Sequence, residues 1–205
     1  MKNKFLKILL VVIGFVLLGG AVFFITNKQT GLSNVSAEQL GDYRLYELGT
    51  EITFNRGGNS LKYMRVKDGW GGQENEYRCT VGNETIMKLY IPGSDGVVLK
   101  LQIDAFGVFA EQETSQTVDV YANERKIITW AVSEPSSYLA TIPTSAIKDN
   151  KLVLKFVPHA PYCPKGDSRD LSMAVKKMKI TKPVAGKTRV KLSLWLRELF
   201  FGKDF

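Results

Sequence analysis

The chain has 205 residues, of which 44% are hydrophobic, and it carries a formal net charge of +8 with one His and two Cys. This length allows one domain of ordinary size beside a targeting segment, and the apolar share is sufficient for a folded core. One His and two Cys are too few for a structural zinc site of the usual spacing. We therefore expect no metal and no cofactor.

The positive charge is concentrated at the two ends of the chain. Three lysines fall within the first seven residues, and nine basic residues lie from Lys176 onward, opposed there only by Glu198 and Asp204. The segment between these ends contains 16 basic and 18 acidic residues. Because a nucleic-acid-binding domain carries its basic side chains on the folded body, this distribution argues against a nucleic acid partner.

Residues 8–25 form an apolar run, ILLVVIGFVLLGGAVFFI, without a charged side chain. At about 1.5 Å per residue a helix of this length spans roughly 27 Å, close to the hydrocarbon thickness of a membrane. The run is longer than the core of a cleaved signal peptide, so it favours an uncleaved anchor within residues 1–26. The lysines before it predict a cytoplasmic N-terminus. We expect a single-pass protein of the inner (plasma) membrane with its folded part periplasmic or extracellular.

The remaining chain divides by composition into a linker, a folded domain and a tail. Residues 27–41 are polar and contain Gly and Ser, as a linker does. Residues 42–182 alternate between apolar and polar side chains, most clearly at residues 97–105. Further strands are expected at residues 43–48, 51–54, 62–66, 85–91, 117–122, 126–130, 138–142, 151–157 and 173–180.

Nine or ten short strands without a long helix between them predict an all-β fold, an antiparallel sandwich of two sheets. A jelly roll is the form we expect, because it protects the edge strands within a single domain of this size.

Residues 183–205 are expected to be a basic amphipathic tail. An apolar stripe recurs there with the spacing of one helix face. The stripe consists of Leu192, Trp195, Leu196, Leu199 and Phe200. Aromatic side chains flanked by basic ones suit a helix on an anionic membrane surface, so lipid is an expected partner. A helix that caps the sandwich, or one that binds a partner protein, is equally compatible with the pattern.

The two cysteines and the single histidine give few chemical options. In an oxidising compartment Cys79 and Cys163 could form one disulfide worth about 2–4 kcal/mol, or they could be two buried thiols. His159 lies in a proline-rich stretch without a nucleophile motif nearby. Local acidic pairs do not establish the opposed carboxylates of a glycosidase. We expect no enzymatic activity.

Three short motifs point to a family. They are Gly69-Trp70 followed by Glu74, the segment QTVDVYAN at residues 116–123, and Asp167-Ser168-Arg169-Asp170-Leu171. In this order they resemble a β-sandwich module appended to bacterial envelope glycan enzymes, such as membrane phosphoglycerol transferases and glycosyltransferases. The resemblance covers residues 68–182 and departs from the module at Ser172, where glycine is usual, at Glu124, where an Asn-Gly pair is usual, and at Cys163, where serine is common.

The resemblance implies an accessory, carbohydrate-binding-like module without its own catalytic centre. An exposed Trp can stack on a sugar ring while Asp, Glu and Arg bind its hydroxyls, so a glycan site is expected at Trp70, Glu74, Asp167 and Arg169. The same residues also suit a structural role, with Trp70 in the core and Asp167 paired with Arg169. The sequence thus predicts a membrane-anchored protein that recognises an envelope glycan or assists polysaccharide assembly. The alternative is a structural subunit of an envelope protein complex that binds protein and lipid.

Overall fold

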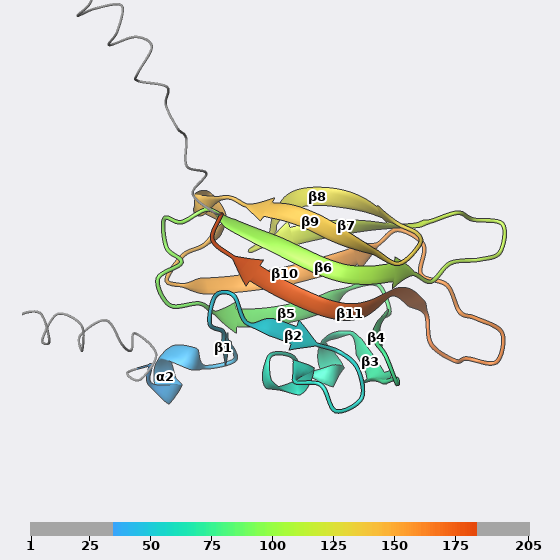
Figure 1. The fold of residues 1–205 in the computed structure, drawn as a ribbon, viewed down its shortest axis with the longest axis horizontal. Helices are drawn as coiled ribbons and strands as arrows, with labels where there is room; N and C mark the ends of the chain where they lie inside the picture. The colour runs from blue at the N-terminus through green and yellow to red at the C-terminus, as the bar shows by residue number, and fades with distance from the viewer. Residues whose placement is uncertain (1–34, 184–205) are drawn as a thin grey trace, which may run out of the picture.

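The computed structural model describes residues 35–183, and this part of the chain folds into two packed β-sheets (Figure 1). The strands are β1 (Arg44–Leu45), β2 (Glu51–Thr53), β3 (Trp70–Gln73), β4 (Arg78–Val81), β5 (Thr85–Tyr90), β6 (Leu99–Gly107), β7 (Gln116–Ala122), β8 (Arg125–Val132), β9 (Ser136–Ile142), β10 (Lys151–Pro158) and β11 (Leu171–Thr181). The helical elements are α2 (Ala37–Leu40) and the 3-10 turns η1 (Ser60–Lys62), η2 (Val66–Asp68) and η3 (Thr144–Ala146). The prediction of an all-β sandwich is confirmed for these residues.

The strand order is that of a jelly roll. One sheet has the order β1-β5-β10-β7-β8, and the other has the order β3-β4-β11-β6-β9 with β2 also paired to β11. The eight strands from β4 to β11 place β4, β6, β9 and β11 in one sheet and β5, β7, β8 and β10 in the other. Among the described strands only the short β1 pairs in parallel, with β5. The jelly-roll form is therefore the one that we expected.

The core lies between the sheets and is built by every second residue of the strands. In β6, Leu99, Leu101 and Ile103 are fully buried, whereas Lys100 and Gln102 are exposed on the outer face. The same alternation runs the whole length of β10. Because side chains of a strand point to opposite faces in turn, each sheet has one apolar face for the core and one polar face for solvent or a ligand.

Two parts of the sandwich differ from the strands expected from the sequence. Residues 62–66, predicted as a strand, lie in and between the turns η1 and η2. Asn59 holds this segment back against β2, because its side chain accepts the Thr53 N–H at 2.8 Å and donates to the Glu51 carbonyl at 3.0 Å. Strands β3 and β4 were not expected. β3 contains two glycines and β4 buries three consecutive residues, so neither alternates.

The first and last strands of the described body meet at one end of the sandwich. The Tyr46 hydroxyl accepts the Ile180 N–H at 2.9 Å and donates to the Thr50 carbonyl at 2.5 Å. In Figure 1, α2 and the final residues of β11 lie at the left. The loops at residues 108–115 and 159–170 extend from the opposite end. The chain therefore enters and leaves the sandwich far from these two loops.

The anchor predicted in residues 1–26 and the apolar stripe of the tail lie outside the described residues. Within residues 35–183 no helix has the length and hydrophobicity needed to cross a membrane.

Candidate functional site

Trp70, which the sequence predicts as a sugar-stacking residue, is part of the core. Its side chain is 2% exposed, and its ring stacks on Phe54 with 5.0 Å between the ring centroids. Its Nε1–H donates to the Ile86 carbonyl at 2.9 Å, which satisfies the indole polar group inside the sandwich. The expectation of an exposed Trp70 is therefore wrong: β3 turns this side chain inward, and its ring is not accessible to a ligand.

Asp167 and Arg169 form a closed ion pair at the base of the loop at residues 159–170. The Arg169 Nε and Nη2 atoms donate to the two carboxylate oxygens of Asp167 at 2.8 and 2.7 Å. The Ser168 N–H donates to the same carboxylate at 2.8 Å. The guanidinium of Arg169 holds the pKa of Asp167 well below its usual range, and the carboxylate raises the pKa of Arg169. Such bidentate pairs stiffen the loop that carries them.

Glu74 lies at the edge of this pair, with its Oε1 atom 3.9 Å from Arg169 Nη2. A Cβ atom at Gly71 would lie 3.3 Å from Arg169 Nη1, so the guanidinium rests against β3. The structure thus brings Glu74, Asp167 and Arg169 together as predicted. Two of the five N–H donors of Arg169, on Nε and Nη2, bind Asp167, and the ion pair fastens the loop to the sandwich.

Cys79 and Cys163 are free, and no disulfide joins them. Cys79 is buried in β4, where burial raises the pKa of its thiol to about 11. Cys163 is exposed, and its thiol donates to the Asp167 carbonyl at 3.3 Å within its own loop. The interpretation of two buried thiols is correct for Cys79 only, because Cys79 packs with Leu171 and Ala174 in a small apolar cluster while Cys163 lies in an exposed turn.

A pocket of about 330 Å³ opens at the loop end of the sandwich, between the loop at residues 108–115 and the start of the loop at residues 159–170. We call it the loop-end pocket. Its lining combines aromatic and polar side chains, including Phe109, Tyr162, Glu113, Ser115, Gln116 and His159. The volume falls at the lower end of the roughly 300–1,000 Å³ typical of small-ligand sites.

Gln116 fixes both loops that form the pocket. This first residue of β7 is 2% exposed, and its Nε2 atom donates to the Ala160 carbonyl at 2.5 Å and to the Val108 carbonyl at 3.5 Å. A single buried amide therefore joins the end of β6 to the segment after β10. Because both bonds are made within the chain, they restrict the movement of the two loops that line the pocket.

Asp119, on the outer face of β7, holds the side chain of His159, which lines the pocket. Its Oδ2 atom lies 3.2 Å from His159 Nε2, and its Oδ1 atom accepts from Lys126 Nζ at 2.7 Å and Thr129 Oγ1 at 2.6 Å. The Lys126 ammonium and the Thr129 hydroxyl lower the pKa of Asp119 to about 2. The carboxylate therefore stays ionised and holds one edge of the imidazole, while the other ring nitrogen has no hydrogen-bond partner among the described residues.

The two aromatic residues that line the pocket, Phe109 and Tyr162, are held in place through the backbone around them. A Cβ atom at Gly107 would lie 2.7 Å from the Phe109 ring and 2.2 Å from the Val132 carbonyl, so only glycine lets the loop turn here. On the opposite side, the Tyr162 N–H donates to the Leu171 carbonyl at 2.7 Å, and this bond holds the tyrosine backbone beside β11. Both rings are thus carried by backbone that is itself fixed to the sandwich.

Neither a protein-family model nor a curated protein matches the sequence. Among solved structures, the fold is similar to the CBM36-1 domain of a multidomain xylanase from the hindgut metagenome of Trinervitermes trinervoides. The TM-score is 0.38, with 11% identity over 66% of this chain and 98% of that chain. It is also similar to a carbohydrate-binding module CBM36 solved with calcium and xylotriose (TM-score 0.36, 8% identity, 64% of this chain and 99% of that chain).

A third similar structure is the acetyl xylan esterase Est2A from the rumen bacterium Butyrivibrio proteoclasticus. It has a TM-score of 0.29 and 14% identity, over 76% of this chain and 34% of the esterase. Because all three TM-scores are below 0.5, the function of this chain has to be argued from its own residues.

One feature of the sequence indicates the loop-end pocket, and it is the position of Gln116. Gln116 occupies an inward position of an alternating strand, and a buried amide needs polar partners that only neighbouring loops can supply. The pairing of Asp119 with His159 joins residues 40 positions apart, and local spacing does not reveal such a contact. Within residues 35–183 no cluster of three or more His, Cys, Asp or Glu side chains could hold a metal ion.

Proposed function

We propose that this protein is a non-catalytic recognition module that binds a terminal unit of a glycan in the loop-end pocket. The observation that carries the proposal is that one pocket is lined by two aromatic side chains, Phe109 and Tyr162, together with several polar ones. The faces of a sugar ring are apolar and stack on aromatic rings, whereas its edge carries hydroxyls that need donors and acceptors. A pocket of about 330 Å³ accommodates a small ligand rather than a polymer.

The polar side chains of the pocket suit hydroxyl groups. His159 has one ring nitrogen held by Asp119, and its other nitrogen has no partner among the described residues. Ser115 can donate and accept, and Glu113 accepts from a hydroxyl. Asp119 itself is neutralised by Lys126, so the pocket presents one carboxylate and no paired cluster of positive charge. An uncharged sugar is the ligand class that this set serves best.

We assign no reaction to the pocket. Nucleophilic catalysis needs a hydroxyl or thiol within hydrogen-bond reach of the base, and among residues 35–183 only Asp119 makes a polar side-chain contact with the His159 imidazole. Glycoside hydrolysis needs two carboxyl groups facing one bond, whereas Glu113 is the only carboxylate that lines the pocket. Recognition requires neither arrangement.

We also propose that the module is anchored in the inner (plasma) membrane of a bacterial envelope and faces outward. This rests on the apolar run at residues 8–25 and on the basic residues before it. The end of the sandwich at which the described chain begins and finishes is opposite the loops at residues 108–115 and 159–170 (Figure 1), and residues of these loops line the loop-end pocket. An anchor attached there would leave the pocket open toward the envelope glycans.

The binding test uses the full-length chain, purified in detergent, on an array of envelope and plant-type glycans followed by titration calorimetry. We expect saturable binding that is lost when Phe109 and Tyr162 are both replaced by alanine. The matched control is Leu139→Ala, which removes a side chain that is 60% exposed and outside the pocket. Circular dichroism establishes that each variant is folded.

Two results would overturn the proposal. One is the absence of binding to every glycan by a folded wild-type chain. The other is binding that the double variant retains at wild-type affinity. The anchor is tested separately by membrane fractionation and protease accessibility: recovery of the full chain in the soluble fraction would contradict it, whatever the result for glycans.

A further inference from the structure

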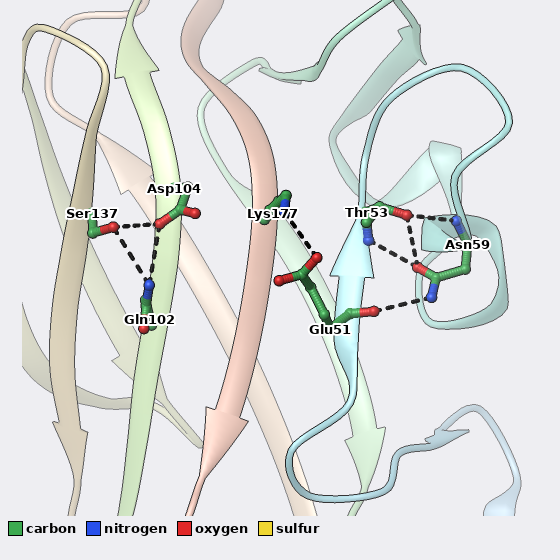
Figure 2. A network of polar contacts seen from close by, with 7 residues as sticks. All are labelled: Glu51, Thr53, Asn59, Gln102, Asp104, Ser137 and Lys177. Carbon is green, nitrogen blue, oxygen red and sulfur yellow. Dashed lines mark hydrogen bonds and ion pairs between the residues drawn. The ribbon is translucent and has the colours of Figure 1, made fainter.

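The outer face of the six-stranded sheet carries a row of polar side chains that runs across four strands. The pairing register places Thr53 of β2 opposite Lys177 of β11, Lys177 opposite Asp104 of β6, and Asp104 opposite Ser137 of β9. All four side chains appear in Figure 2. With strands about 4.8 Å apart, the row spans roughly 14 Å, which is longer than one sugar ring.

Contacts within this face hold the side chains in place. The Ser137 hydroxyl donates to Asp104 Oδ1 at 2.5 Å, and Gln102 Nε2 donates to the same oxygen at 3.3 Å. Lys177 Nζ lies 3.0 Å from Glu51 Oε1 (Figure 2). The second oxygen of Asp104 has no partner among the described residues. This oxygen can therefore accept a hydrogen bond from a ligand.

Three adjacent depressions lie on this face. One of about 240 Å³ includes Ser137, Asp104 and Lys176, and one of about 280 Å³ includes Lys176, Lys177 and Thr53. A smaller depression of about 30 Å³ shares Asp104 with the first and Lys177 with the second. Because neighbouring depressions share lining residues, they are adjacent to one another across the strands. We call the three together the cross-strand groove.

The charges along the cross-strand groove balance. Its lining contains three carboxylates and three ammonium groups: Glu51, Glu76, Asp104, Lys176, Lys177 and Lys179. Lys177 pairs with Glu51, and Lys176 lies 3.3 Å from Glu76. A polyanion would meet as many repulsive as attractive groups, so the groove offers no electrostatic gain to nucleic acid or to an acidic polymer. Alternating donors and acceptors without net charge suit a chain of hydroxyl groups.

We propose that the cross-strand groove binds an extended, uncharged glycan chain along its length. The proposal takes its ligand class from the proposed function and adds a second site, on a different sheet, for internal units of the same polymer.

The experiment compares polymer binding with binding of short oligosaccharides, using the full-length chain in detergent. Affinity electrophoresis with the neutral polymers hydroxyethylcellulose, arabinoxylan and dextran gives the polymer affinity, and alginate serves as the polyanion. We expect retardation by a neutral polymer that added salt does not change, and no retardation by alginate once added salt screens the basic ends of the chain. The double substitution Asp104→Ala with Lys177→Ala is expected to weaken retardation by about tenfold or more.

The matched control is Lys100→Ala. Lys100 is an exposed lysine on the same face, bonded to Thr141 at 2.7 Å, and it lies outside the groove lining. It should leave the retardation unchanged. Failure of this inference can be told apart from failure of the proposed function. If the double variant still binds oligosaccharides and binds the polymer as tightly as wild type, the groove proposal is wrong and the pocket proposal stands. Retardation by alginate in place of the neutral polymers, or by none of the four, also overturns it.

Discussion

The carboxylate of Asp119 lies 3.2 Å from Nε2 of His159, and this contact joins the outer face of β7 to the first residue after β10. The Lys126 ammonium lies 2.7 Å away on the other carboxylate oxygen. Asp119 therefore links three segments of the chain through one side chain that is 12% exposed. The stability of the sandwich and the position of the pocket wall both depend on the charge of this group.

Replacement of Asp119 by Asn is expected to reduce stability at neutral pH and to flatten its decline in acid. The Lys126 and Thr129 contacts lower the pKa of Asp119 to about 2, from 3.8 in an unpaired side chain. Because the folded-state pKa is the lower one, the ionised carboxylate stabilises the folded state at every pH above the unfolded-state pKa of Asp119. This stabilisation is lost as the pH falls toward the folded-state pKa. The contribution is about 2 kcal/mol.

Urea unfolding of wild type and variant between neutral pH and the acid limit measures this difference. Glu111→Gln serves as a control, because Glu111 is exposed and forms no ion pair among the described residues. If the free energies of unfolding of wild type and Asp119→Asn differ by the same amount below and above pH 4, the charge of Asp119 contributes nothing to stability.

Replacement of Gly107 by Ala tests whether close packing positions the aromatic wall. The added Cβ atom would lie 2.2 Å from the Val132 carbonyl, which cannot move without disturbing β8. We expect a loss of about 1–3 kcal/mol in the free energy of unfolding and weaker glycan binding as Phe109 shifts. Gly72→Ala is the matched control, since nothing lies within 4 Å of its added Cβ atom. Equal stability of the two variants would contradict the packing argument.

Sequence reasoning predicts the sandwich well because burial on one face leaves a periodic trace. The run from Val97 to Ala105 alternates in the sequence, and β6 alternates in the structure. The alternation of apolar and polar residues is absent where both faces of a strand are covered, as at residues 78–80. It is also absent where glycine takes the place of an apolar residue, as at Gly71. The turns at residues 60–68 follow from the side chain of Asn59, whose bonds reach back to β2 and are not visible as a local pattern.

The candidate site was less predictable because it depends on contacts between distant residues. The sequence left a binding role and a structural role open for Asp167 and Arg169, and their contacts support the structural one. The motif that contains this pair could not reveal that the neighbouring pocket is built by Gln116 and His159. These two residues become neighbours only when β7 pairs with β10.

Substitution of Trp70 separates a core role from a binding role. Trp70→Ala removes the stacking on Phe54 and leaves a cavity, so we expect a loss of about 3–5 kcal/mol in the free energy of unfolding. Trp70→Phe keeps an aromatic ring but loses the bond to the Ile86 carbonyl, and it should cost about 1–2 kcal/mol. Titration of folded Trp70→Phe should give wild-type glycan affinity. If this variant lost glycan binding while its stability was nearly unchanged, Trp70 would have a role in binding.

Thiol labelling distinguishes the two cysteines in the native protein. Cys163 is exposed and should react at once with a chromogenic disulfide reagent. Cys79 is 4% exposed, and burial raises the pKa of its thiol to about 11, so it should react only after denaturation. We expect one equivalent of rapid reaction in the folded chain, two in denaturant, and loss of the rapid phase in Cys163→Ser. Two equivalents found only after reduction would mean that the cysteines pair, and the loop at residues 159–170 would then have to move toward β4.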